Sequence, residues 1–191
     1  MPGSAVDGLN YTDPARPPCS PETLVGRLET AAAAALGGPP DVWHIHNHSL
    51  GKNCVFTEAV FLMAERGHRL FLQIHDFPED GRPANYRGLL NAVGRGDPCR
   101  LGARLYPQAP NVLYAVLNHR DAQFLREAGC PEEHVCLLPN AVSGPASADE
   151  GGSPPEDGLF LYPTRAIRRK NMGEFILWAA CEPGARFAAT L

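Results

Sequence analysis

Short, nearly continuous apolar runs alternate along the chain with segments whose apolar residues recur at helical spacing. The first helical segment follows Ser20, a good N-cap with Pro21 behind it, and it ends at Gly37. Strands are predicted over 42–46, 70–75, 112–117, 135–138, 159–162 and 186–191. Helices are predicted over 20–36, 55–66, 86–93, 118–128 and 171–181.

This alternation of strands and helices predicts an α/β fold. Strands that are apolar throughout, rather than at every second residue, are typical of parallel sheets that are covered on both sides. We therefore expect a Rossmann-like parallel sheet with helices on both faces. Because such sheets bind ligands beyond the carboxyl ends of their strands, the residues directly after each strand are the first candidates for a functional site.

Changes in composition divide the chain into four parts. Residues 1–19 are polar and Pro-rich without periodicity, and residues 143–158 consist of Gly, Pro, Ser, Ala and acidic residues. We interpret these two segments as an irregular lead and a linker. They leave an N-terminal domain over 20–142 and the start of a second domain over 159–191. A length of 191 residues fits one domain and a piece of another.

The net charge and the cysteines limit which binding partners and which cellular compartment we expect. With 17 basic and 21 acidic residues the net charge is −4, and no basic stripe favours nucleic acid or an anionic membrane surface. No apolar run approaches the roughly 18 residues of a membrane span, and the N-terminus does not have the pattern of a secretory signal. The six cysteines form no CxxC pair, so we expect reduced thiols in a cytoplasmic protein.

Three histidines alternate around the end of the first predicted strand. His44, His46 and His48 would share one face of an extended segment and could hold a metal ion there. A zinc-dependent hydrolase is therefore an alternative hypothesis. In the competing interpretation, His44 packs inside the sheet while His46 and His48 bond to loop backbone.

The loop after this strand supplies polar candidates for a ligand site, namely His46, Asn47, Lys52 and Asn53. Lys52 is expected at the N-terminus of the second helix, where it can meet a polar ligand. The spacing excludes a phosphate-binding P-loop, because His46 stands where a glycine is needed and Asn53 where a serine or threonine is needed.

His75 ends the second predicted strand, and Asp76 follows it at once. A histidine at this position is expected to face the crevice beyond the sheet, where the carboxylate of Asp76 could fix its tautomer. It could orient a hydroxyl group or carry a proton, so we take both residues as catalytic candidates. The alternative is a core histidine that is satisfied by backbone groups.

The densest positive cluster of this acidic chain lies between the fifth strand and the helix whose expected N-cap is Asn171. It comprises Arg165, Arg168, Arg169 and Lys170. Helix N-termini favour anions, and arginine and lysine add fixed charge and hydrogen-bond donors, so a diphosphate is the natural ligand. A solvated basic loop is the alternative.

Taken in order, three segments resemble GT-B glycosyltransferases of the large retaining group called family 4. Asp41–His46 corresponds to the motif D-V-V-H-x-H of the first domain of that family, and Val135–Val142 to V-x-x-I-P-N-G-V before its linker. The segment from Thr164 to Asn171 corresponds to G-R-x-x-x-x-K-G at the opening of its second domain, with the Arg-to-Lys spacing of five retained.

The resemblance implies transfer of a sugar from a nucleotide-sugar donor to an acceptor hydroxyl with retention of configuration. The acceptor would be a sugar, a lipid or a small molecule. The family is generally metal-independent, so we expect neither metal nor cofactor. Arg165 and Lys170, with Arg169 beside them, would hold the donor diphosphate and offset charge on the leaving group. His75 would lie near the reacting sugar, with the loop 76–86 facing the acceptor. Four residues at and after the end of the first strand would also belong to the acceptor side: His46, Asn47, Lys52 and Asn53.

The chain also departs from the family pattern. Thr164 and Asn171 replace the glycines that flank the Arg–Lys motif, and Ala141 replaces the glycine after Pro-Asn. Neither the initial strand with its Gly-rich loop nor the Glu-x7-Glu segment of the second domain is found. We therefore expect an incomplete second domain, a truncated chain and little or no transfer activity from the chain alone. A zinc-dependent hydrolase and a non-catalytic α/β binding module stay open as alternatives.

Overall fold

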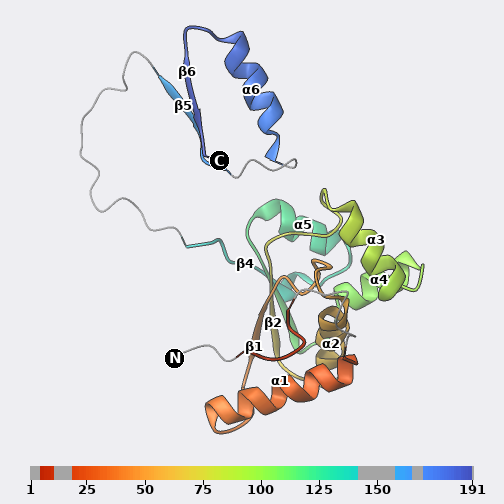
Figure 1. Ribbon diagram of the computed structural model, residues 1–191. Coiled ribbons are helices and arrows are strands. Elements are labelled where there is room, and N and C mark those ends of the chain that lie inside the picture. Colours follow the sequence, from red (N-terminus) through yellow and green to blue (C-terminus); the bar gives the residue numbers. More distant parts are fainter. Residues whose placement is uncertain (1–4, 11–18, 142–157, 165–169, 191) are drawn as a thin grey trace. The chain divides into compact units, whose positions relative to one another are not determined.

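The computed structural model describes residues 5–10, 19–141, 158–164 and 170–190 (Figure 1). The chain divides into two compact units, Met1–Ala141 and Val142–Leu191. In the described part of the chain, no helix combines the length and the apolar character that crossing a membrane requires.

The first unit alternates helices and strands along the chain. Its elements are α1 (Pro21–Leu36), β1 (Trp43–His46), α2 (Cys54–Glu65), β2 (Leu70–Ile74), α3 (Pro83–Ala92), α4 (Pro98–Leu105), β3 (Val112–Val116), α5 (His119–Glu127), the 3-10 turn η1 (Glu132–His134) and β4 (Val135–Leu137).

The four strands of this unit form one parallel sheet in the order β1-β2-β3-β4. Ile45 lies opposite Leu72, Leu72 opposite Tyr114, and Tyr114 opposite Val135. Parallel neighbours require crossover connections, which α2, the pair α3 and α4, and α5 supply. The expected α/β class with a parallel, Rossmann-like sheet flanked by helices is thereby confirmed.

The core of the first unit is built from every second strand residue. Leu72, Ile74, Tyr114 and Val116 are almost completely buried, and they belong to one cluster with side chains of α1, α2 and α5. Successive strand side chains point to opposite faces, so the residues between them lie on the other side of the sheet. His44 and His46 belong to that second set and are both exposed.

Polar side chains begin the helices where the sequence predicts them. Ser20 Oγ accepts a hydrogen bond from the backbone N–H of Thr23 at 3.2 Å, and Asn118 Oδ1 accepts from Asp121 N–H at 3.0 Å. Each bond satisfies a donor of the first helical turn that has no partner within the helix. The left-handed Gly37 ends α1, as the sequence also predicts.

One helix is absent from the sequence-based prediction. The chain between residues 94 and 111 contains α4, whose N-cap is Asp97 and whose first residue is Pro98. Leu101 and Leu105, four residues apart, are its buried positions and pack with Leu89 of α3. The prediction failed because eight residues with two apolar anchors give a weak periodic signal. The neighbouring helix α3 also begins earlier than predicted, at Pro83.

The second unit contains two parallel strands, β5 (Leu159–Tyr162) and β6 (Arg186–Ala189), joined through α6 (Met172–Cys181). Aromatic rings hold the three elements together: Phe160 contacts both Trp178 and Phe187, and Phe175 contacts Phe187. None of the described residues of α6 is buried, so this βαβ unit leaves much of its apolar surface uncovered.

Candidate functional site

The carboxyl ends of β1 and β2 are tied together by Asn47. Its backbone N–H donates to Gln73 O at 2.9 Å, which extends the ladder between the two strands. Its side-chain Oδ1 accepts from the N–H of His75 at 2.8 Å and from that of Asp76 at 3.3 Å. The residue adopts a left-handed conformation, φ 52°, which asparagine tolerates better than most residues. The backbone of both catalytic candidates is therefore fixed to the end of β1.

The ring of His75 meets the ring of His46. His46 Nδ1 and His75 Nε2 are 2.9 Å apart, and the ring planes are inclined by 29°. Partial burial lowers the pKa of His46, and His44 and His75 beside it lower it further because each can carry positive charge. The histidines that the sequence placed after two different strands thus lie in direct contact.

Asp76 has a different partner from the one expected. Its carboxylate forms an ion pair with Arg82 at 2.7 Å, whereas the ring of His75 contacts the ring of His46. The side chain of Arg82 is 14% exposed and that of Asp76 is 41% exposed, so the pair is half-buried. The sequence analysis did not identify Arg82. The sequence indicates it only as a basic residue that follows the acidic residues of the segment 76–81.

The loop that carries Asp76 is anchored at two further points. Phe77 packs against Tyr106 and Phe124, and Tyr106 Oη donates to Glu79 Oε2 at 3.0 Å. Burial and the nearby carboxylate of Glu79 raise the pKa of Tyr106, so its hydroxyl keeps its proton. These contacts hold the loop after β2 against Tyr106 and α5.

His48 does not join the other two histidines of the alternating motif. It is 2% exposed, and its Nε2 donates to the carbonyl of Leu105 at 2.7 Å. His44 and His46 lie on the exposed face of the sheet instead. The trio of His44, His46 and His48 is thus not assembled, and the described residues contain no cluster of three potential metal ligands.

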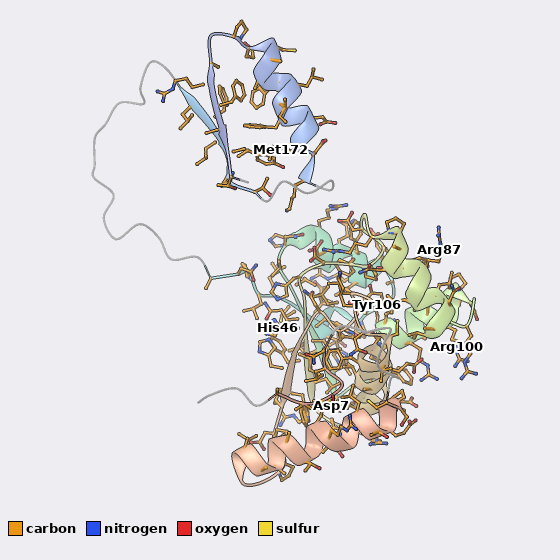
Figure 2. The ribbon with its side chains drawn as sticks, viewed as in Figure 1. Asp7, His46, Arg87, Arg100, Tyr106 and Met172 are labelled. Carbon is orange, nitrogen blue, oxygen red and sulfur yellow. The ribbon has the colours of Figure 1, made fainter. Side chains whose placement is uncertain are left out.

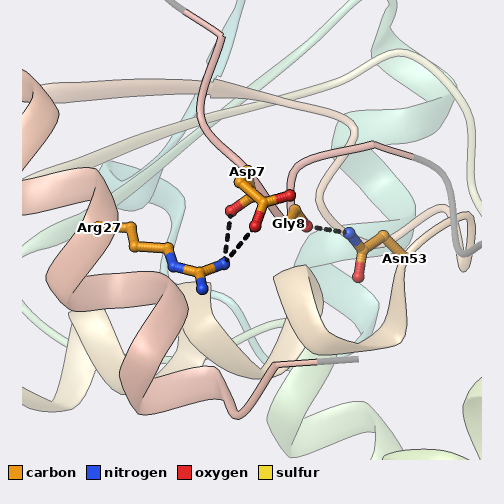
Figure 3. A network of polar contacts seen from close by, with 4 residues as sticks. All are labelled: Asp7, Gly8, Arg27 and Asn53. Carbon is orange, nitrogen blue, oxygen red and sulfur yellow. Dashed lines mark hydrogen bonds and ion pairs between the residues drawn. The ribbon is translucent and has the colours of Figure 1, made fainter. Parts of the chain in front are cut away.

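Asn53 begins α2 and holds the N-terminal segment (Figure 3). Its Oδ1 accepts from Phe56 N–H at 3.0 Å, while its Nδ2 donates to Gly8 O at 2.7 Å and to Asn10 O at 2.9 Å. Asp7 pairs with Arg27 of α1 at 3.0 Å. Lys52, directly before this cap, is exposed at the N-terminus of α2, as the sequence predicts.

The predicted diphosphate site lies partly outside the described residues, which exclude Arg165, Arg168 and Arg169. Lys170 is described, and its backbone carbonyl accepts a hydrogen bond from Tyr162 Oη. Asn171 is the N-cap of α6, as predicted, with φ 54° and no capping bond from its side chain. The lysine is therefore fixed between β5 and the start of α6.

Comparison with known proteins gives one informative similarity. No family model and no solved structure matches the chain. The chain is 33% identical over 154 residues to mannosylglucosyl-3-phosphoglycerate synthase of Petrotoga mobilis, an alignment that covers 71% of the chain and 29% of that protein. The chain thus spans less than a third of the length of this relative. The match supports the resemblance to glycosyltransferases in general.

Proposed function

We propose that the chain is part of a retaining glycosyltransferase of the GT-B type that transfers a sugar from a nucleotide-sugar donor to an acceptor hydroxyl. The observation that carries the proposal is the placement of His75 directly beyond the carboxyl end of β2, held by Asn47 and His46. Parallel α/β sheets bind ligands at that edge. The similarity to a synthase whose name contains two sugars supports the same reaction class.

In this proposal, His75 lies near the transferred sugar and interacts with one of its hydroxyl groups. Asp76 and Arg82 form a fixed ion pair beside it and give the edge of the site its polar character. His46, Asn47, Lys52 and Asn53 belong to the acceptor side, with Asn47 and Asn53 acting through the backbone segments that they hold.

Lys170, with Arg165 and Arg169, would bind the donor diphosphate. Transfer leaves an additional negative charge on the nucleoside diphosphate, and fixed positive charges offset it without a metal ion. The position of Lys170 directly before α6 supports this role, because amides at a helix N-terminus favour anions.

We further propose a small anionic acceptor in a cytoplasmic protein. The name of the relative contains a phosphoglycerate group, which is an anion in neutral solution. An exposed Lys52 on the acceptor side suits such a ligand electrostatically.

Titration of the isotope-labelled chain with nucleoside diphosphates, followed by NMR, tests the donor site. We expect amide signals of Lys170 and of the first turn of α6 to shift on addition of at least one diphosphate. Lys170→Ala should abolish these shifts, whereas Arg186→Ala on β6 serves as a charge-matched control and should retain them. An absence of shifts with every diphosphate would leave a non-catalytic binding module or simple truncation as the explanation, and the same absence in the longer protein that contains this chain would overturn the donor role.

A further inference from the structure

A row of aromatic rings crosses from β2 to β1 and back to the end of β2. The ring of Phe71 lies 4.8 Å from that of His44, and His44 lies 4.4 Å from His46. The ring of His46 is in turn 5.2 Å from that of His75 (His46 is labelled in Figure 2). The candidate residue His75 is therefore the last member of a continuous row.

The first two members of the row are fixed by the sheet. His44 Nε2 lies 2.9 Å from Oε1 of Gln73, which is only 5% exposed. Because an amide oxygen only accepts, this contact requires His44 to carry a proton on Nε2. The ring of His44 then packs against one side of His46 and limits the rotamers that His46 can adopt.

The contact between His46 and His75 contains one proton. Two imidazole nitrogens at 2.9 Å form a hydrogen bond only if one donates and the other accepts. The planes of the two rings are inclined by 29°. Among the described residues, nothing bonds the other ring nitrogen of His75, Nδ1, which leaves it for a ligand.

We propose that His46 is a positioning residue for His75: it accepts a hydrogen bond from His75 Nε2–H and so makes His75 Nδ1 an acceptor for a substrate hydroxyl. The alternative arrangement, with the proton on His46 Nδ1, would turn His75 Nδ1 into a donor. The proposed arrangement places the proton of both rings on Nε2, which is the preferred tautomer of neutral histidine in water. This inference rests on the proposed function only for the identity of the ligand.

The protonation state of the two imidazoles also controls the contact between His46 and His75. A second proton would place two N–H groups against each other and break the hydrogen bond. The titratable group against His46 besides His75 is His44, whose ring lies 4.4 Å away and which contacts Gln73 of β2; Asp76, next to His75 in the chain, is paired with Arg82. Partial burial and the neighbouring histidines keep the pKa of His46 low, which favours the intact contact near neutral pH.

Nitrogen NMR of the histidine rings tests the tautomer directly in this chain at neutral pH. We expect a slowly exchanging proton on His75 Nε2 and a scalar coupling through the hydrogen bond to His46 Nδ1. His46→Ala should abolish both signals. His46→Asn should keep the slow proton, because an amide oxygen can accept at the place of Nδ1. A proton found on His46 Nδ1, or a His75 signal unchanged in His46→Ala, would overturn the proposal.

Kinetics of transfer by the protein that contains this chain give a second readout. His46→Ala should lower kcat/KM about tenfold, as expected for one misplaced hydrogen bond, and His46→Asn should recover most of this loss. His46→Gln, whose amide extends past the position of Nδ1, should not recover it. Equal activity of the three variants would overturn the positioning role. The NMR measurement needs no substrate, so it still judges the His46–His75 contact if no transfer activity is found.

Discussion

At the scale of single residues, neighbouring histidines on one short segment have opposite environments. His46 is exposed on the sheet, whereas His48, two residues later, is inside the core. Burial lowers the pKa of His48 to about 4. Because the unfolded chain protonates this imidazole near its ordinary pKa of about 6.5, acid favours the unfolded state at this position.

His48 should therefore make the first unit acid-sensitive. The folded state keeps the imidazole neutral, so stability is lost as the pH falls from about 6.5 towards 4. The loss should reach about 3 kcal/mol at pH 4. Urea unfolding of the wild-type chain and of His48→Gln over this pH range measures it.

In His48→Gln, the amide nitrogen can replace Nε2 as the donor to Leu105 O, but nothing titrates. The difference in unfolding free energy between the two proteins should change by up to about 1.4 kcal/mol per pH unit below pH 6.5. A constant difference across this range would show that His48 takes up its proton equally in both states.

At the scale of elements, the capping residues combine helix initiation with long-range contacts. Asn118 caps α5, and its side-chain bonds to described residues stay within the first turn, through Asp121. Asn53 caps α2 and also binds two carbonyl groups of the N-terminal segment 5–10. The same residue type thus has a local role in one helix and a connecting role in another.

Asn53→Ala should cost more stability than Asn118→Ala. Loss of a cap costs about 1 kcal/mol, and the additional unpaired carbonyl groups should bring Asn53→Ala to about 2 kcal/mol. Only Asn53→Ala should also accelerate amide hydrogen exchange in residues 5–10, measured by mass spectrometry. If both variants left that segment equally protected, the bonds to Gly8 and Asn10 would have no part in holding it.

The sequence was most informative for elements with several consistent local signals. Ser20, Pro21 and Gly37 mark both ends of α1, and continuous apolar runs mark the strands of the parallel sheet. The helix α4 was missed because Leu101 and Leu105 are its only buried positions. Its Asp-Pro start was visible in the sequence, but a cap alone does not distinguish a short helix from a turn.

The site was less predictable, because side-chain partners depend on packing between strands. The sequence placed His46 and His75 at two strand ends, and a parallel sheet brings such ends to one edge. It did not show that His75 would contact His46 while Asp76 paired with Arg82. Nor did periodicity distinguish the buried His48 from the exposed His46, since the left-handed Asn47 between them breaks the strand alternation.

At the scale of the whole molecule, the two units differ in how well they bury their apolar side chains. The first unit has a large core cluster that joins its sheet to α1, α2 and α5, and a smaller one between α3 and α4. In the second, Leu161 of β5 is 58% exposed, and Ile176 and Leu177 of α6 are 62% and 64% exposed. A two-stranded sheet and one helix are too small to bury enough apolar area for high independent stability.

Hydrogen exchange should reveal this difference. Amides of α6 should exchange more than about tenfold faster than those of α2, which has a comparable length but contains the buried residues Val60 and Met63. Mass spectrometry of peptides from both helices in one sample provides the comparison. Equal protection would contradict the expectation and would indicate that other parts of the protein stabilise α6.

The strand order has a further consequence, for association between molecules. The outermost strands of the first sheet, β1 and β4, have four and three residues, whereas the inner strands have five each. Backbone groups on outer strands can pair with a strand of another chain, and short outer strands offer few such groups. The longest and most apolar strands of this unit lie inside the sheet, where both of their edges are already paired. The arrangement that forms the site thus also limits edge-to-edge aggregation.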